Sequence, residues 1–197
     1  MITAQPNELT RYIDIEKLDF VKKSLLAIAG TILLTLSAKL SIPFWPVETT
    51  MQTTAVAIIG VLYGRNLATI TVLLYLFEGA LGMPVFAGTP AKGIGMAYMM
   101  GPTAGFLIGF IFAAYIAGYM SERGYGRDFK SALILFAVSA LAIYIPGLSW
   151  LSYMFGVEMA YNNFLLWLPA TVVKTGLAIA AMMLIKSKIK TVKERAN

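Results

Sequence analysis

Residues 82–118, GMPVFAGTPAKGIGMAYMMGPTAGFLIGFIFAAYIAG, join a segment rich in glycine and proline to a long apolar run. The run from 101 to 121 is long enough to cross a bilayer as a helix, because a span needs about 20 mostly apolar residues. The preceding part, 82–100, holds too many helix-breaking residues to extend that helix. The stretch therefore predicts an irregular loop that leads into a membrane-spanning helix.

The composition of the whole chain agrees with a membrane location. Of its 197 residues 58% are hydrophobic, and the mean hydropathy of +0.74 is far above that of a soluble domain. We predict an all-α integral membrane protein with one domain: a polar segment 1–20, a six-helix bundle 22–186 and a basic tail 187–197. The region 148–163 mixes aromatic residues with Glu158 and two asparagines, and we expect an interfacial helix or a packed loop there. The six transmembrane helices are predicted at 22–41, 51–64, 66–81, 101–121, 130–146 and 164–186.

The basic residues are distributed unevenly between the loops on the two sides of the predicted membrane. Of the 16 Lys and Arg residues, 13 fall on one predicted side of the membrane, whereas only Lys39 and Lys92 fall on the other and Lys174 lies inside a span. Positively charged loops face the cytoplasm. Both termini are therefore predicted to be cytoplasmic, and the loops 42–50, 82–100 and 147–163 to be external.

The chain lacks residues that several classes of protein need for their function. The chain has no cysteine and no histidine, which removes thiolate chemistry, the commonest general base and the commonest metal ligand. There is no P-loop motif for ATP, and the positive charge is not gathered on a soluble face that could bind nucleic acid. We expect no cofactor and no metal ion. Any energised step must be driven by a partner or an ion gradient.

The three predicted external loops hold most of the glycine, proline, tryptophan and polar residues outside the termini, whereas the cytoplasmic connections are short and basic. Such an elaborated face over a small bundle favours the capture of a ligand outside the cell. Glycines in the 82–100 loop would let backbone N–H groups approach a ligand closely. The alternative is that glycine and proline only end the flanking helices, and their spacing alone leaves both readings open.

Five separated motifs occur in a specific order: PVETTMQT at 46–53, PVFAG at 84–88, GPTAGFLIGF at 101–110, YIPGLSWL at 144–151 and LPATVVKTGLA at 168–178. In this the chain resembles the BioY family, the biotin-binding subunits (S-components) of energy-coupling factor (ECF) transporters. The resemblance implies a six-helix subunit that captures biotin outside a prokaryotic cell and lies in its cell (inner) membrane. It also implies partners, a transmembrane coupling subunit and two cytoplasmic ATPases that use ATP, although some members act without a dedicated set.

Lys174 is the only basic residue deep in a predicted span. An unpaired ammonium there costs at least about 2.5 kcal/mol, so we expect it to face the interior of the bundle and to have a partner. The carboxylate of biotin could be that partner. The alternative is an internal ion pair with Glu78 or Glu158.

The family pattern has an acidic residue three positions before this lysine, and here the position is Thr171. A hydroxyl can hydrogen-bond a ureido group, but it cannot hold Lys174 by charge. Asn162, Asn163 or Glu78 could compensate for the missing carboxylate.

In the first external loop, Thr50 and Gln52 match the family's PVP-x-T-x-QT pattern, although its second proline is Glu48 here. The amide of Gln52 both donates and accepts, which suits the urea-like ring of biotin. Gln52 could instead cap the short second helix, and Thr50 shares that alternative.

Small-molecule pockets are mostly apolar, so Trp45, Tyr75 and Phe86 are candidates for the apolar part of the site. For Trp45 the aromatic belt at the membrane surface is the favoured explanation. Lys92 could attract an anionic ligand or be simply solvated. The candidates for the rest of the binding site are Tyr75, Phe86, Ala87, Gly88 and Lys92.

Ala27, Thr31 and Thr35 recur every four residues in the first helix. Such a ridge of small residues lets another helix approach closely, either the coupling subunit or a neighbour within the bundle. Three other functions stay open: capture of a different vitamin, a small intramembrane enzyme and a proton-coupled carrier. The last two are short of titratable groups, since Glu78 is the only carboxylate inside a predicted span.

Overall fold

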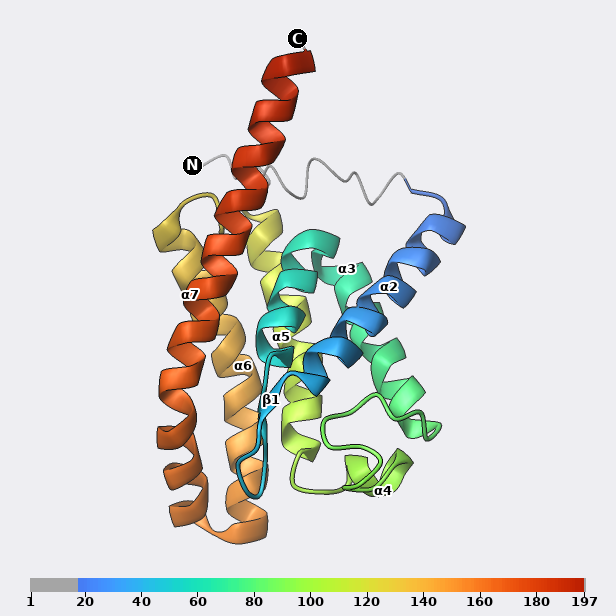
Figure 1. Ribbon diagram of the computed structural model, residues 1–197, viewed down its shortest axis with the longest axis vertical. Coiled ribbons are helices and arrows are strands. Elements are labelled where there is room, and N and C mark those ends of the chain that lie inside the picture. Colours follow the sequence, from blue (N-terminus) through green and yellow to red (C-terminus); the bar gives the residue numbers. More distant parts are fainter. Residues whose placement is uncertain (1–17, 197) are drawn as a thin grey trace.

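The computed structural model describes the backbone of residues 18–196 and the side chains of residues 18–184 (Figure 1). The N-terminal part of the predicted polar segment and the side chains of the predicted basic tail lie outside the described residues. The elements are α2 (Phe20–Lys39), β1 (Ser41–Ile42), β2 (Thr49–Thr50), α3 (Gln52–Ala80), α4 (Gly95–Met99), α5 (Ala104–Glu122), α6 (Phe129–Phe155) and α7 (Val157–Ala196).

The helix α3 is two helical segments that meet at Gly64. This residue has φ 71° and ψ 169°, which no α-helix contains. The carboxylate of Glu122 accepts a hydrogen bond from the backbone N–H of Arg65 at 2.9 Å, and so satisfies a free donor at the start of the second segment. The two predicted helices 51–64 and 66–81 are thus confirmed as separate helical segments.

The prediction of an interfacial helix or a loop at 148–163 is wrong. The helix α6 continues to Phe155 and α7 starts at Val157, so only Gly156, with φ 89°, separates them. Pro146 lies inside α6 and does not end it. A proline removes one backbone hydrogen bond, which a helix packed in a membrane protein tolerates. Both helices are therefore longer than the predicted 130–146 and 164–186.

A second difference is the pairing of Ser41 with Thr50 and of Ile42 with Thr49, which forms a small antiparallel hairpin between α2 and α3. The prediction of an all-α chain did not include it. The backbone N–H of Met51 also donates to the carbonyl of Leu40 at 3.0 Å, so the hairpin is closed at its base. We call residues 41–50 the hairpin loop.

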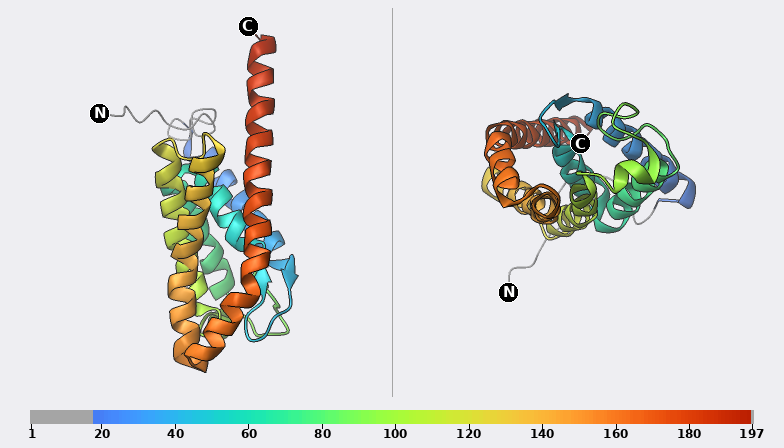
Figure 2. Two further views of the ribbon diagram at one scale, coloured as in Figure 1. Left: turned by 90° about the vertical axis from the view of Figure 1, so that its left-hand side faces the viewer. Right: turned by 90° about the horizontal axis from the view of Figure 1, so that it is seen from below.

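The long helices pack in the order α2, α3, α5, α6, α7, and an end-on view shows them arranged around a centre (Figure 2). Small residues allow close packing between α5 and its neighbours. A Cβ added at Gly60 of α3 would lie 2.5 Å from the Cβ of Ala117, and one at Gly109 would lie 2.7 Å from the Cα of Ile143. Five helices among the described residues are long and apolar enough to cross a membrane. One of these five is α3, with both of its helical segments counted together. Their outward faces carry many exposed Leu, Ile and Phe side chains, as expected for contact with lipid.

The small-residue ridge of α2 faces inward. Ala27 and Thr31 are buried, and the Thr31 hydroxyl donates to the Glu78 carboxylate at 3.0 Å, while Thr35 is half-buried. Between them a Cβ at Gly30 would meet the side chains of α3. Ala27 and Thr31 therefore pack against a neighbouring helix of the same bundle. The prediction that this ridge is a docking face for a coupling subunit is wrong.

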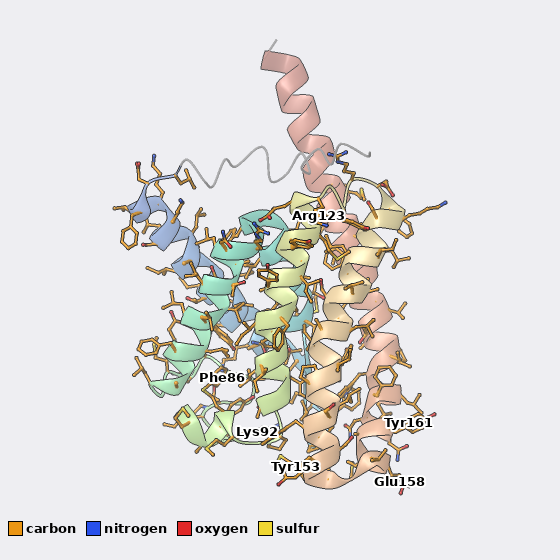
Figure 3. All side chains as sticks on the ribbon, turned by 180° about the vertical axis from the view of Figure 1, so that it is seen from behind. Phe86, Lys92, Arg123, Tyr153, Glu158 and Tyr161 are labelled. Atoms are coloured by element: carbon orange, nitrogen blue, oxygen red, sulfur yellow. The ribbon has the colours of Figure 1, made fainter. Side chains whose placement is uncertain are left out.

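The loops gather at one end of the bundle. The hairpin loop, α4 and the turn between α6 and α7 lie towards the end opposite the C-terminus (Figure 1). Phe86 and Lys92 lie at this end with Glu158, whereas Arg123 lies at the other end (Figure 3). The elaborated loops that the sequence places on one side of the membrane are therefore together in space.

Candidate functional site

A cavity of about 340 Å³ lies under these loops, within the range of about 300–1,000 Å³ that is usual for small-molecule sites. The hairpin loop, the start of α3, the 82–100 loop and the helices α5, α6 and α7 all contribute to its walls. Among the described residues no group of His, Cys, Asp and Glu could hold a metal ion. The predicted site residues that line the cavity are Thr50, Gln52, Phe86, Ala87 and Lys92.

Gln52 supplies a buried amide at the start of α3. Its Nε2 donates to the hydroxyl of Tyr75 at 2.7 Å, and this hydroxyl donates to the carbonyl of Val85 at 3.0 Å. The backbone N–H of Gln52 is capped by the hydroxyl of Thr50 at 3.2 Å, so Thr50 has the capping role and Gln52 does not. Tyr75 is fully buried and holds Gln52 from behind, while Gln52 itself borders the cavity.

Phe86 forms an aromatic wall. Its ring stacks on Tyr98 with 4.9 Å between the centroids, and meets the edge of Tyr75 at 5.4 Å. Gly79 of α3 lies directly against the ring, where a side chain would collide with it. Burial raises the pKa of Tyr98 to about 12, with the Glu48 carboxylate acting in the same direction, so its hydroxyl stays neutral at physiological pH. The wall is therefore closely packed and uncharged.

The sequence did not single out a second aromatic wall, which α5, α6 and α7 build together. The ring of Tyr144 stacks on Trp167 at 6.4 Å, and Phe106 meets Trp167 edge-on at 5.6 Å. All three residues line the cavity. Aromatic residues occur throughout this chain, so only the packing of three helices distinguishes these from lipid-facing ones.

Lys174 lies one layer behind the cavity and is only 7% exposed. Its Nζ donates to Thr49 Oγ1 at 3.0 Å, to the carbonyl of Thr50 at 2.9 Å and to Thr53 Oγ1 at 3.4 Å. All three partners belong to cavity-lining residues. Thr49 and Thr53 were not among the predicted site residues, although they lie within the PVETTMQT motif.

Neither carboxylate proposed as an internal partner reaches this ammonium. Glu78 accepts from Thr31, Glu158 is exposed at the start of α7, and Lys174 forms no salt bridge within the described part of the chain. The alternative of an internal ion pair is wrong. Among the residues that the structure describes, the ammonium of Lys174 is met only by neutral oxygens.

Thr171 and Asn163 do not line the cavity. The hydroxyls of Thr171 and Tyr144 are 2.6 Å apart, so Thr171 supports a residue of the aromatic wall. Asn163 is buried, and its Nδ2 donates to the carbonyl of Met159 at 3.0 Å. Neither side chain replaces the missing carboxylate beside Lys174.

Lys92 forms an ion pair with Glu48, which neither of the two possibilities for this lysine included, and its side chain remains 46% exposed. Gly88, with φ 69°, makes room for the pair, because a Cβ there would lie 2.7 Å from Lys92 Cδ and 3.0 Å from Glu48 Oε1. Burial raises the pKa of the Glu48 carboxyl, but hydrogen bonds from Lys92 and Ser41 and the charges of Lys92 and Lys39 outweigh it and lower the pKa below its ordinary value. The pair is therefore charged at neutral pH.

Lys39 is a further residue of this end that the sequence did not single out. Its Nζ donates to the carbonyls of Pro84 and Phe86 at 2.9 Å each, and to the carbonyl and hydroxyl of Thr89 at 3.3 and 3.1 Å. The end of α2 thereby holds the segment that carries Phe86. A lone lysine at the end of an apolar helix was the available signal, but it does not reveal which loop the lysine meets.

The fold and the cavity define a multi-pass membrane protein with a small-molecule site at one end of its helical bundle. A family model fixes the class more closely. The chain belongs to the BioY family, whose model matches residues 7–191.

Relatives and solved structures agree with this assignment. The chain is 33% identical over 174 residues to a biotin transporter BioY of Rhizobium etli, covering 84% of this chain and 90% of the relative. It is 28% identical over 158 residues to a probable biotin transporter BioY of Rickettsia prowazekii, covering 80% and 77%.

The fold is similar to that of the S-component for biotin from an ECF-type ABC transporter. The TM-score is 0.70 at 21% identity, over 85% of this chain and 92% of that one. FolT bound with folic acid gives a TM-score of 0.56 at 19% identity, over 86% and 90%. The predicted S-component-like bundle is thus confirmed.

Proposed function

We propose that this protein captures biotin outside the cell as the substrate-binding subunit of an ECF-type transporter. Its family and the names of its relatives support the ligand, and the fold supports the role of an S-component. One observation carries the proposal: a single cavity combines aromatic walls, a buried amide and a nearby buried ammonium that has no carboxylate partner among the described residues.

These groups suit the chemistry of biotin. Its ureido ring both donates and accepts hydrogen bonds, as the amide of Gln52 does. Its sulfur-containing ring and alkyl chain are apolar, and Phe86 and Trp167 both offer apolar surface to the cavity. Its carboxylate would lie by Thr49 and Thr53, within the field of the Lys174 charge.

The threonines allow Lys174 to act without direct contact. A hydroxyl that accepts a hydrogen bond from Lys174 still has its own proton to donate, so Thr49 can relay the interaction to a carboxylate in the cavity. In surroundings of low dielectric constant, a charge one layer away also acts more strongly than it would in water. The predicted partnership of Lys174 with the biotin carboxylate therefore becomes, in this proposal, an indirect one.

The orientation follows from the positive-inside rule. Most of the basic residues belong to the end that carries Arg123 and to the termini, whereas Phe86 and Lys92, which line the cavity, lie at the opposite end (Figure 3). We therefore place the cavity outside and both termini in the cytoplasm, in the cell (inner) membrane of a prokaryote. Since the chain has no P-loop, energy would come from partners, a transmembrane coupling subunit and two cytoplasmic ATPases.

The test is calorimetric titration of the detergent-purified protein with biotin. The Lys174→Met variant keeps the length of the side chain and removes the charge, and we expect it to bind biotin about ten to a hundred times more weakly. Lys130→Met changes an exposed lysine at the start of α6 and serves as the matched control, with unchanged affinity.

Thiamine, riboflavin and folate are titrated in parallel. Saturable binding of one of these in place of biotin would favour the alternative, capture of a different vitamin by the same fold. A folded wild-type protein that does not bind biotin would refute the proposal. Equal biotin affinities of wild type and Lys174→Met would refute the role of the lysine.

A further inference from the structure

We propose that the ion pair between Glu48 and Lys92 holds the hairpin loop against the 82–100 loop and thereby retains the ligand in the cavity. This inference rests on the proposed function, since it concerns the residence of the ligand in the same site. The two residues belong to different loops, and both of them line the cavity. Their ion pair therefore joins two walls of one site.

The pair is placed where its charges are poorly screened. The side chain of Glu48 is only 11% exposed and that of Lys92 is 46% exposed. A partly buried pair keeps more of its Coulomb energy than a fully exposed one. Breaking it by moving one loop would leave the Glu48 carboxylate inside the protein without its cation, which is unfavourable.

The backbone around Lys92 is shaped for this contact. Gly88 has a positive φ, and its missing side chain leaves the space through which Lys92 reaches Glu48. The backbone N–H of Lys92 donates to the carbonyl of Gly88 at 2.9 Å, which closes the turn. The glycine of the PVFAG motif is thus explained by the ion pair as well as by any approach to a ligand.

Each of the two loops is fastened to the bundle separately. Lys174 of α7 holds Thr49 and Thr50 of the hairpin loop, and Lys39 of α2 holds the 84–89 part of the other loop. The ion pair connects these two fastened segments. Because the pair joins two walls of the cavity, separating the hairpin loop from the 82–100 loop would widen the cavity on this side, so the strength of the pair should enter the dissociation rate.

The first experiment measures that rate. Wild type, Glu48→Gln, Lys92→Met and the double variant are loaded with radiolabelled biotin and chased with excess unlabelled biotin. We expect each single variant to release biotin about ten times faster, which corresponds to about 1.4 kcal/mol. The double variant should be no faster than the faster single variant, because both changes remove one shared interaction.

Glu158→Gln is the matched control. It also removes a carboxylate at this end of the molecule, but Glu158 is exposed and does not line the cavity. Its release rate should equal that of wild type. Unchanged release in both single variants, or additive effects in the double variant, would overturn the proposal.

A second measurement does not depend on the ligand. Hydrogen exchange at the backbone amides of residues 85–89 and 91–93 is followed in the ligand-free protein. Exchange should be faster in Glu48→Gln and Lys92→Met than in wild type and Glu158→Gln. If wild type binds no biotin, the proposed function fails, while exchange still decides whether the pair fastens the loops: unchanged exchange refutes the fastening itself.

Discussion

Replacing Gly79 by alanine tests whether the aromatic wall determines ligand binding. The added Cβ would lie 2.8 Å from Cε1 of Phe86 and closer still to two other ring atoms. Carbon atoms in contact are about 3.5–4.0 Å apart, so Cε1 must move by at least about 0.7 Å and the two closer ring atoms by more. Tyr98 covers one face of the ring and Tyr75 meets it at 88°, which leaves the cavity as the free side.

Overpacking of this kind costs about 1–3 kcal/mol, and alanine returns up to about 1 kcal/mol of helix propensity. We therefore expect the Gly79→Ala variant to be less stable by about 1–2 kcal/mol and to bind biotin about tenfold more weakly. Thermal unfolding in detergent and calorimetric titration measure the two effects. Gly176→Ala is the control, because a Cβ at that exposed helical position meets nothing within 4 Å.

A second variant distinguishes collision from a general loss of structure. In Gly79→Ala combined with Phe86→Leu, the side chain that collides is shorter, so the double variant should unfold at a higher temperature than Gly79→Ala alone. Stability and affinity of Gly79→Ala equal to those of wild type would refute the reasoning. So would additive destabilisation in the double variant, because residues in contact should not act independently.

Three further changes test other parts of the structure. Gly64→Ala forces a side chain into a left-handed conformation and should destabilise the protein by about 1–2 kcal/mol in thermal unfolding; an unchanged unfolding temperature would contradict the kink. Thr171→Val removes the 2.6 Å hydrogen bond to Tyr144 and should cost about 1–3 kcal/mol of stability with weaker biotin binding, whereas Thr171→Ser should behave as wild type. Lys39→Met should speed hydrogen exchange at Thr89 and its neighbours, and equal exchange in variant and wild type would show that Lys39 does not hold that loop.

The membrane architecture was largely predictable because it depends on local composition. A helix in lipid must be apolar over its whole length, so uncharged runs mark the spans directly. Even the break between two spans was visible, since Arg65 interrupts the apolar run next to Gly64. The loop rich in glycine and proline was placed correctly for the same reason.

The wrong prediction of an interfacial helix or a loop at 148–163 arose because the local sequence indicates a helix end, whereas packing against another helix keeps α6 intact. Pro146 and the polar residues around Glu158 are typical of a helix end, yet α6 continues past the proline. The ring of Phe106 lies against Gly147, so α5 supports α6 at the very point where the backbone loses a hydrogen bond. That support comes from another helix and cannot be inferred from the segment itself.

The site was predictable only where a motif pointed to it. Gln52 and Phe86 were found through the family pattern, and both line the cavity. The ion pair was not found, because Glu48 and Lys92 belong to loops that meet only in the folded protein. Glu48 appeared to be a mere departure from the family's proline, but in the structure it is the residue that takes up the charge of Lys92.

The neutral surroundings of Lys174 also follow from a departure from the family pattern, here threonine in place of an acidic residue at position 171. With threonine at position 171 there is no carboxylate one turn away, so the ammonium uses its hydrogen bonds on Thr49, Thr50 and Thr53, more than 120 positions earlier in the chain. Within the described residues its charge therefore meets no carboxylate, while that of Lys92 is paired with Glu48. Of these two lysines, only the buried one remains available to balance an anion. An uncompensated positive charge beside the cavity favours an anionic ligand, and the carboxylate of biotin is such an anion.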